Sequence, residues 1–188
     1  MRIAFTGSSS TGKTTLARAL SEDPQFTSIV PQFFDSTRYV TPREFGYEQA
    51  DEMPGNIRRE WRMKYFEQKK RAEQWRDGFI TDRSFVDIAA YWMVFDCADD
   101  QSRRNAMELS CRELAERYDM HFYFPTGLVP RERGGRRSQD ERLHRGIDLQ
   151  ILDLLRQWKL PFISLSDPRL DERVRSVRAW TRAACNPA

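Results

Sequence analysis

The segment from Gly7 to Thr14 constrains the chain more than any other part of the sequence. It matches G-x-x-x-x-G-K-[ST] at every fixed position and lies between a short apolar run and a helical pattern. The glycines of such a loop let the backbone curl, so that successive amides face a polyphosphate at a helix N-terminus. We therefore expect a phosphate-binding loop (P-loop) that holds ATP. The expected ATP-binding residues are Gly7, Ser8, Ser9, Ser10, Thr11, Gly12, Lys13, Thr14 and Thr15.

Two side chains at the end of this loop have specific expected roles. Lys13 is expected to reach the β- and γ-phosphates and to act in catalysis, and the Thr14 hydroxyl is expected to ligate magnesium. ATP and Mg²⁺ are thus the expected cofactors.

The rest of the chain alternates short apolar runs with longer helical patterns. This alternation predicts an α/β fold in a single domain, with a five-stranded parallel sheet and helices on both faces. Ligands of such a sheet bind at the carboxyl ends of the strands. We expect strands at 3–6, 28–33, 79–82, 120–124 and 161–165, and helices up to about 20 and at 56–76, 84–95, 101–117, 138–158 and 171–184.

Composition narrows the class of protein. Hydrophobic residues make up 39% and charged residues 31% of the 188 residues, as in soluble globular proteins. No run of about 18 apolar residues occurs and the N-terminus leads straight into a strand, so we expect no membrane span, no signal peptide and a cytoplasmic location. Three widely spaced cysteines predict neither a disulfide framework nor a metal site. The net charge of +3 permits a phosphate-rich ligand.

Asp82 and Arg83 follow the third expected strand, at a place where this type of fold binds ligands. Asp82 could hold magnesium through water or orient the acceptor hydroxyl, and Arg83 could bind a phosphate. The alternative is a helix cap, in which Asp82 or Ser84 only binds the amides of the next helix. We expect both Asp82 and Arg83 to act in the site, with Asp82 as a candidate metal ligand.

Asp35 and Arg38 lie just beyond the second expected strand. A carboxylate there would face the γ-phosphate across the cleft, where the acceptor hydroxyl needs a general base. Arg38 would bind an acceptor phosphate or stabilise the transition state. The alternative is a polar turn with a solvated arginine.

Residues 126–138 are polar and rich in arginine, and they follow the fourth expected strand. Phosphoryl transfer spreads negative charge over the equatorial oxygens, and a closing arginine loop would compensate that charge and expel water. We therefore expect a lid here. Its arginines are Arg131, Arg133, Arg136 and Arg137.

The helical pattern over residues 58–76 carries eight basic and three acidic residues with interleaved aromatic side chains. Such a helix could stack a base and attract a phosphate backbone, which would suit DNA as a substrate. The aromatic residues also fit an apolar stripe against the core, and we expect this use for Trp61 and Trp75.

With these residues in view, the chain resembles the P-loop nucleoside and nucleotide kinase group over nearly its whole length. Residues 82–91 are similar to the Asp-Arg motif of thymidylate kinases and, with Asp for Glu, to the Glu-Arg-Ser motif of deoxynucleoside kinases. Residues 135–142 resemble the lid of the ATPase-like group that includes nicotinamide riboside kinases, which implies that Arg136 and Arg137 act in catalysis.

One further similarity and one difference point to a specialised relative. The spacing of Asp35 and Arg38 is similar to the base-and-arginine pair of bacteriophage polynucleotide kinases. Thymidylate kinases usually carry an acidic residue inside the P-loop, whereas residues 8–11 have none. Bacteriophage kinases that phosphorylate 5-hydroxymethyluracil in DNA form one such specialised group.

The resemblance implies a P-loop kinase fold and transfer of the γ-phosphate of ATP to a hydroxyl of a nucleoside- or nucleotide-type acceptor. It also implies the cytoplasm of a bacterium or of a phage-infected host. A P-loop regulatory ATPase and a nicotinamide riboside kinase are the alternatives. The acceptor, the identity of the base and the oligomeric state stay open at the level of sequence.

Overall fold

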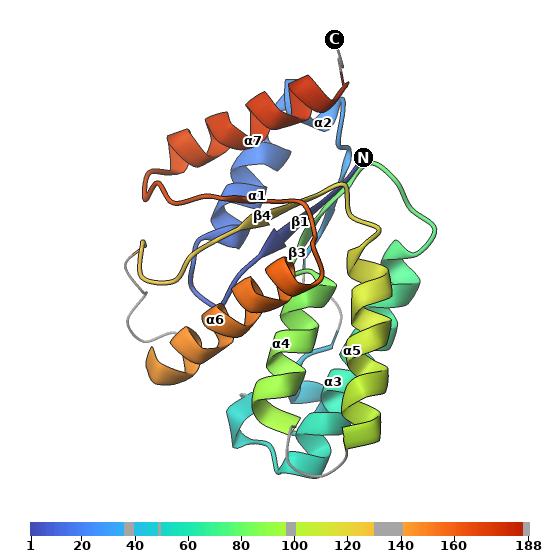
Figure 1. Ribbon diagram of the computed structural model, residues 1–188. Coiled ribbons are helices and arrows are strands. Elements are labelled where there is room, and N and C mark those ends of the chain that lie inside the picture. Colours follow the sequence, from blue (N-terminus) through green and yellow to red (C-terminus); the bar gives the residue numbers. More distant parts are fainter. Residues whose placement is uncertain (36–39, 49, 97–100, 130–140, 186–188) are drawn as a thin grey trace.

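Five parallel strands form the central sheet, in the order β2-β3-β1-β4-β5 (Figure 1). The computed structural model describes residues 1–35, 40–48, 50–96, 101–129 and 141–185. The predicted parallel five-stranded sheet is therefore confirmed. The strands are β1 (Arg2–Thr6), β2 (Gln32–Phe34), β3 (Phe79–Asp82), β4 (Met120–Tyr123) and β5 (Phe162–Ser164).

Helices cover both faces of this sheet, as predicted. One face carries α1, α2 and α7, and the other carries α3, α4, α5 and α6 (Figure 1). Two short 3₁₀ helices, η2 and η3, precede α3. The helices are α1 (Lys13–Ser21), α2 (Pro24–Thr27), η2 (Pro42–Phe45), η3 (Ala50–Glu52), α3 (Gly55–Glu73), α4 (Phe85–Asp96), α5 (Gln101–Ala115), α6 (Glu141–Gln157) and α7 (Leu170–Cys185).

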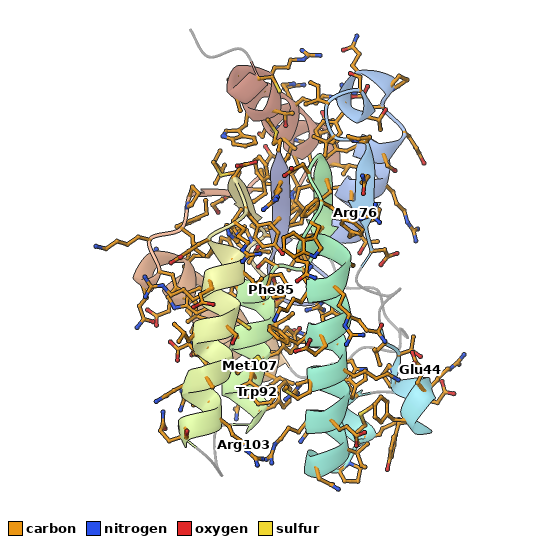
Figure 2. All side chains as sticks on the ribbon, turned by 90° about the vertical axis from the view of Figure 1, so that its right-hand side faces the viewer. Glu44, Arg76, Phe85, Trp92, Arg103 and Met107 are labelled. Carbon is orange, nitrogen blue, oxygen red and sulfur yellow. The ribbon has the colours of Figure 1, made fainter. Side chains whose placement is uncertain are left out.

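The sheet separates two hydrophobic cores. Successive side chains of a strand point to opposite faces, so Ile3 and Phe5 of β1 pack beneath α1 and α7, whereas Ala4 between them packs toward α4. The larger core lies on the side of α3–α6. Figure 2 shows Phe85, Trp92 and Met107 gathered between α3, α4 and α5, and all three are buried.

The strand order places the site. β1 is the middle strand, with β3 on one side and β4 on the other, and the direction of strand addition reverses there. Ligands of open α/β sheets bind at such a switch point, outside the carboxyl ends of the strands. The pairing of Phe5 with Asp82 brings the end of β3 beside the loop that follows β1.

Two details of the secondary structure differ from the sequence-based prediction. The second strand begins at Gln32 instead of residue 28, because Asp23 accepts a hydrogen bond from the Gln25 amide and Pro24 starts the short helix α2. The expected packing of Trp75 against the core is wrong. The helix α3 ends at Glu73, and Trp75 beyond it is 85% exposed.

Within the described residues, we find no helix with both the length and the apolar character needed to cross a membrane.

Candidate active site

The loop between β1 and α1 depends on its two glycines. Gly7 has φ +154° and Gly12 has φ +89°, both in a region that L side chains rarely adopt. A Cβ atom on Gly7 would lie 2.6 Å from the carbonyl oxygen of Phe124, and one on Gly12 would lie 3.1 Å from Arg173 Nη1. Any other residue would strain the backbone at both positions and would also clash with the backbone of Phe124 at Gly7.

Lys13 lies inside this loop and is buried. Its ammonium donates to the carbonyl oxygens of Gly7 at 2.7 Å and Ser8 at 2.5 Å, and to Thr11 Oγ1 at 3.2 Å. Burial lowers the pKa of Lys13, and the nearby guanidinium of Arg83 adds to this shift. A desolvated cation surrounded by loop backbone can exchange these carbonyl contacts for phosphate oxygens.

Thr14 and Asp82 meet at the mouth of the loop. Thr14 Oγ1 donates to Asp82 Oδ2 at 2.7 Å, and the other carboxylate oxygen of Asp82 is buried without a hydrogen-bond partner among the described residues. Magnesium binds proteins through one or two such oxygen groups and takes its other ligands from water and phosphate. The pair therefore fits the first protein ligands of a magnesium ion.

Ser84, not Asp82, caps the following helix. Its hydroxyl accepts from the amide of Val86 at 3.1 Å, at the start of α4. The helix-cap alternative for this segment thus belongs to Ser84. The carboxylate of Asp82 is turned toward Thr14 instead.

Arg83 spans from the end of β3 to the loop. Its guanidinium donates to Ser9 Oγ at 2.8 Å and lies 4.9 Å from the centre of the Tyr91 ring. The hydroxyl of Tyr91 lies 3.1 Å from the same Ser9 oxygen. Burial disfavours ionisation of Tyr91, but the charge of Arg83 and the hydrogen bonds outweigh it and lower the pKa of the phenol. The cluster can therefore bind an anion beside the loop.

Asp87 is a buried carboxylate that the sequence analysis missed. It accepts from the amide of Gly7 at 2.9 Å, and from the amide and hydroxyl of Ser84 at 2.7 and 2.9 Å. One side chain thus joins the P-loop to the start of α4. The available signal was an aspartate in the first turn of α4, whose other residues up to Phe95 are apolar or aromatic.

Of the remaining predicted site residues, Asp35 and Thr15 lie in the part of the chain that the structure describes. Asp35 is half-buried and directly follows β2. Because Phe34 pairs with Thr81, the next residues of the two parallel strands, Asp35 and Asp82, lie at the same register position. Thr15 is exposed on α1. The predictions for Arg38 and the lid arginines fall outside the described residues: Arg131, Arg133, Arg136 and Arg137.

Cationic and aromatic side chains line the contact between α3 and α4. The guanidinium groups of Arg58 and Arg62 lie 5.2 and 4.4 Å from the Phe95 ring centre, and Phe95 stacks on Tyr91. Trp61 donates its indole N–H to the carbonyl oxygen of Val40 at 3.2 Å. The N-terminal half of α3 is therefore connected through Phe95 and Tyr91 to Ser9 of the P-loop.

Two residues from α6 and α7 near the P-loop were also missed by the sequence analysis. Arg173 of α7 is buried and donates to the carbonyl oxygen of Thr11 at 2.9 Å. Asp148 of α6 accepts from the Thr126 amide at 3.3 Å, and burial raises the pKa of its carboxyl group. Neither residue belongs to a recognisable motif, because each approaches the site through tertiary packing.

The sequence also matches a known protein family. A sequence model described as AAA domain matches residues 2–173. No curated protein matches the sequence significantly.

Several solved structures share the fold. Deoxyadenosine kinase from M. mycoides with bound dATP is 14% identical, with a TM-score of 0.69 over 97% of this chain and 100% of that chain. Thymidylate kinase from Candida albicans is 13% identical, with a TM-score of 0.67 over 97% of this chain and 91% of that one. NadR protein in complex with NR is 18% identical, with a TM-score of 0.65 over 96% of this chain and 50% of that one. At these identities the similarity concerns the fold.

Proposed function

The chain belongs to the AAA domain family of P-loop proteins, and from this premise we propose that it is an ATP-dependent kinase that phosphorylates a hydroxyl of a nucleoside- or nucleotide-type acceptor. A P-loop domain implies ATP binding. One observation carries the step from binding to transfer. The end of β3 meets the loop at two points, through Asp82 on Thr14 and through Arg83 on Ser9.

These contacts suggest a role for each side chain in the proposed phosphoryl transfer. Lys13 would bind the β- and γ-phosphates, and Thr14 and Asp82 would hold Mg²⁺, which neutralises charge on the phosphate oxygens. Arg83 would bind the transferring phosphate or a phosphate of the acceptor. Such fixed charges act strongly in a dry site, because they need no rearrangement during the reaction.

Asp35 and Asp82 are the two candidates for orienting the acceptor hydroxyl. Asp82 already contacts Thr14 and fits the metal, which leaves Asp35 as the better candidate for the base. Asp35→Asn should then abolish transfer while ATP binding stays within about twofold of wild type. Unchanged transfer in this variant would move the role to Asp82.

The acceptor class rests on the fold relatives and on α3. Deoxyadenosine kinase and thymidylate kinase share the fold, and in this proposal the basic helix α3 would border the acceptor. Within this class we propose a free nucleoside or nucleotide, or 5-hydroxymethyluracil in bacteriophage DNA. Nicotinamide riboside is a further candidate, because the NadR structure in complex with NR shares the fold. For the lid, we propose that Arg136 and Arg137 close over the γ-phosphate.

The test is transfer from γ-labelled ATP to a panel of acceptors. The panel holds nucleosides, nucleotides, nicotinamide riboside, plain DNA and hydroxymethyl-modified DNA, with Lys13→Met as the inactive control. We expect label in one acceptor class and none with the control. DNA as acceptor should also show binding that weakens steeply with salt, since counterions are released. Label released only as phosphate, with every acceptor unlabelled, would instead support the regulatory ATPase.

A further inference from the structure

Arg83 has a backbone conformation that a side chain normally avoids. Its φ is +73°, in the left-handed region, although it is not a glycine. Such a conformation costs on the order of 1–3 kcal/mol and persists only where the surrounding structure holds it, most often at functional sites. The same residue places its guanidinium on Ser9 of the P-loop. The contacts that maintain this conformation therefore bear on the site.

One hydrogen bond and one weaker polar contact hold the backbone at this point. The amide of Arg83 donates to the carbonyl oxygen of Phe5 in β1 at 2.9 Å, and its carbonyl oxygen lies 3.3 Å from the hydroxyl of Thr81. The first bond continues the ladder between neighbouring strands. The second comes from a side chain, so it can be removed without touching the sheet.

The Thr81 hydroxyl is itself held in one orientation. The ammonium of Lys69 donates to this oxygen at 2.6 Å, which leaves the hydroxyl proton as the only donor. Glu73 Oε1 lies 2.6 Å away and is the main acceptor of this proton, whereas the carbonyl oxygen of Arg83, at 3.3 Å, is a weaker second acceptor.

Lys69 and Glu73, which orient the Thr81 hydroxyl, form a buried ion pair. They are one turn apart on α3, pair directly with each other, and are 0% and 4% exposed. Burying both charges is expensive, and a well-packed apolar pair of similar volume is often at least as stable. The Tyr118 hydroxyl donates to Glu73 Oε2 at 2.7 Å, and the Phe85 ring centre lies 5.3 Å from Lys69 Nζ. The pair is thus fully built into the core between α3, α4 and β3.

We propose that Lys69, Glu73 and Thr81 form a positioning triad that holds Arg83 in its left-handed conformation and thereby aims its guanidinium at the P-loop. The proposal rests on the proposed kinase function, because it assumes that Arg83 acts in transfer. It assigns a use to a buried ion pair of α3. It also makes α3, whose Arg62 lies over the Phe95 ring of α4, part of the structure that orients a phosphate-binding arginine.

The central experiment is a double-mutant cycle between Thr81 and Arg83. Thr81→Val keeps the shape of the side chain and removes the hydroxyl, whereas Thr81→Ser keeps the hydroxyl. We expect Thr81→Val to lower kcat/KM by about tenfold or more, since small misplacements of a catalytic group are costly, and Thr81→Ser to restore most of it. In an Arg83→Ala background, Thr81→Val should have no further effect, because its route of action is gone.

Thr181→Val supplies the matched control. Thr181 is also a buried threonine, and its hydroxyl donates to the Val177 carbonyl at 2.8 Å in α7, on the far face of the sheet. Its loss should lower the unfolding midpoint without changing kcat/KM. An equal loss of kcat/KM in Thr181→Val, or additive effects of Thr81→Val and Arg83→Ala, would overturn the triad.

A second measurement does not depend on activity. A crystal structure of Thr81→Val reports the φ of Arg83 directly. We expect this residue to leave the left-handed region and the contact with Ser9 to be lost. If Arg83 keeps its conformation in that variant, the triad is refuted, even if the protein proves to transfer phosphate. If instead wild type transfers no phosphate but Arg83 moves in the variant, the kinase proposal fails and the structural role of the triad stands.

Discussion

His121 should make the protein progressively less stable as the pH falls from about 6.5 to about 4. Its ring is fully buried in β4 between two fixed partners. Nε2 lies 3.2 Å from the carbonyl oxygen of Ala115, which can only accept, so this nitrogen carries the proton. Nδ1 lies 3.2 Å from Thr6 Oγ1 and accepts from it. Burial lowers the pKa of His121 to about 4, against a smaller opposing contribution of the bond to Ala115.

The sign follows from proton uptake in the two states. In the unfolded chain His121 takes up a proton near its ordinary pKa of 6.5, whereas the folded protein takes it up only near about 4. Between these values the unfolded state binds more protons, so the free energy of unfolding rises with pH. The contribution of His121 is complete above about pH 6.5. It falls by about 2 kcal/mol at pH 5 and about 3 kcal/mol at pH 4.

Urea unfolding at pH 7.5 and pH 5, followed by circular dichroism, measures this effect. Carboxyl groups also titrate over part of this range, so the comparison is with His121→Gln, which keeps them all. For a urea m-value of about 2 kcal/mol per molar, the midpoint of wild type should fall by about 1 M more than that of the variant. If both proteins lose the same stability between the two pH values, the reasoning about the buried neutral ring is refuted.

Three further predictions follow from individual positions. Gly7→Ala should destabilise the protein by about 1–3 kcal/mol in urea unfolding and weaken ATP binding, because its Cβ would lie 2.6 Å from the backbone oxygen of Phe124. Gly146→Ala, in the middle of α6 with open space around the position, should instead raise the free energy of unfolding by about 0.5–1 kcal/mol; a loss would contradict it. Lys13→Met should lower labelled-phosphate transfer by at least about a hundredfold while the thermal midpoint stays level or rises, since a buried charge is removed. A midpoint that falls with the activity would show that Lys13 mainly holds the loop together.

The P-loop and the sheet could be predicted because their signals are local. The glycine spacing defines the loop, and the alternation of apolar runs with helical patterns defines the parallel sheet. The end of β3 was also located correctly. The short helix α2 was missed because the apolar residues after it resemble a strand, while the cap at Asp23 decides the local structure. Trp75 fitted the helical period but lies beyond the end of the helix.

The contacts within the candidate site could not be predicted in this way. Asp87 reaches Gly7 across 80 positions of the chain, and Tyr91 reaches Ser9 across 82. Such contacts depend on how α4 packs against the sheet, which no local pattern encodes. The left-handed backbone of Arg83 is equally a product of its surroundings, since arginine has no intrinsic preference for it.

The double attachment of Asp87 has a consequence for how the proposed kinase could acquire a new acceptor. Because one carboxylate binds both the P-loop and the start of α4, a substitution that shifts the start of α4 would also disturb the P-loop. For the proposed kinase, variation in acceptor choice is therefore least restricted about two helical turns beyond Asp87, around Phe95 and the facing Arg58. Directed evolution for altered acceptors should accumulate its substitutions there and leave Asp87 unchanged.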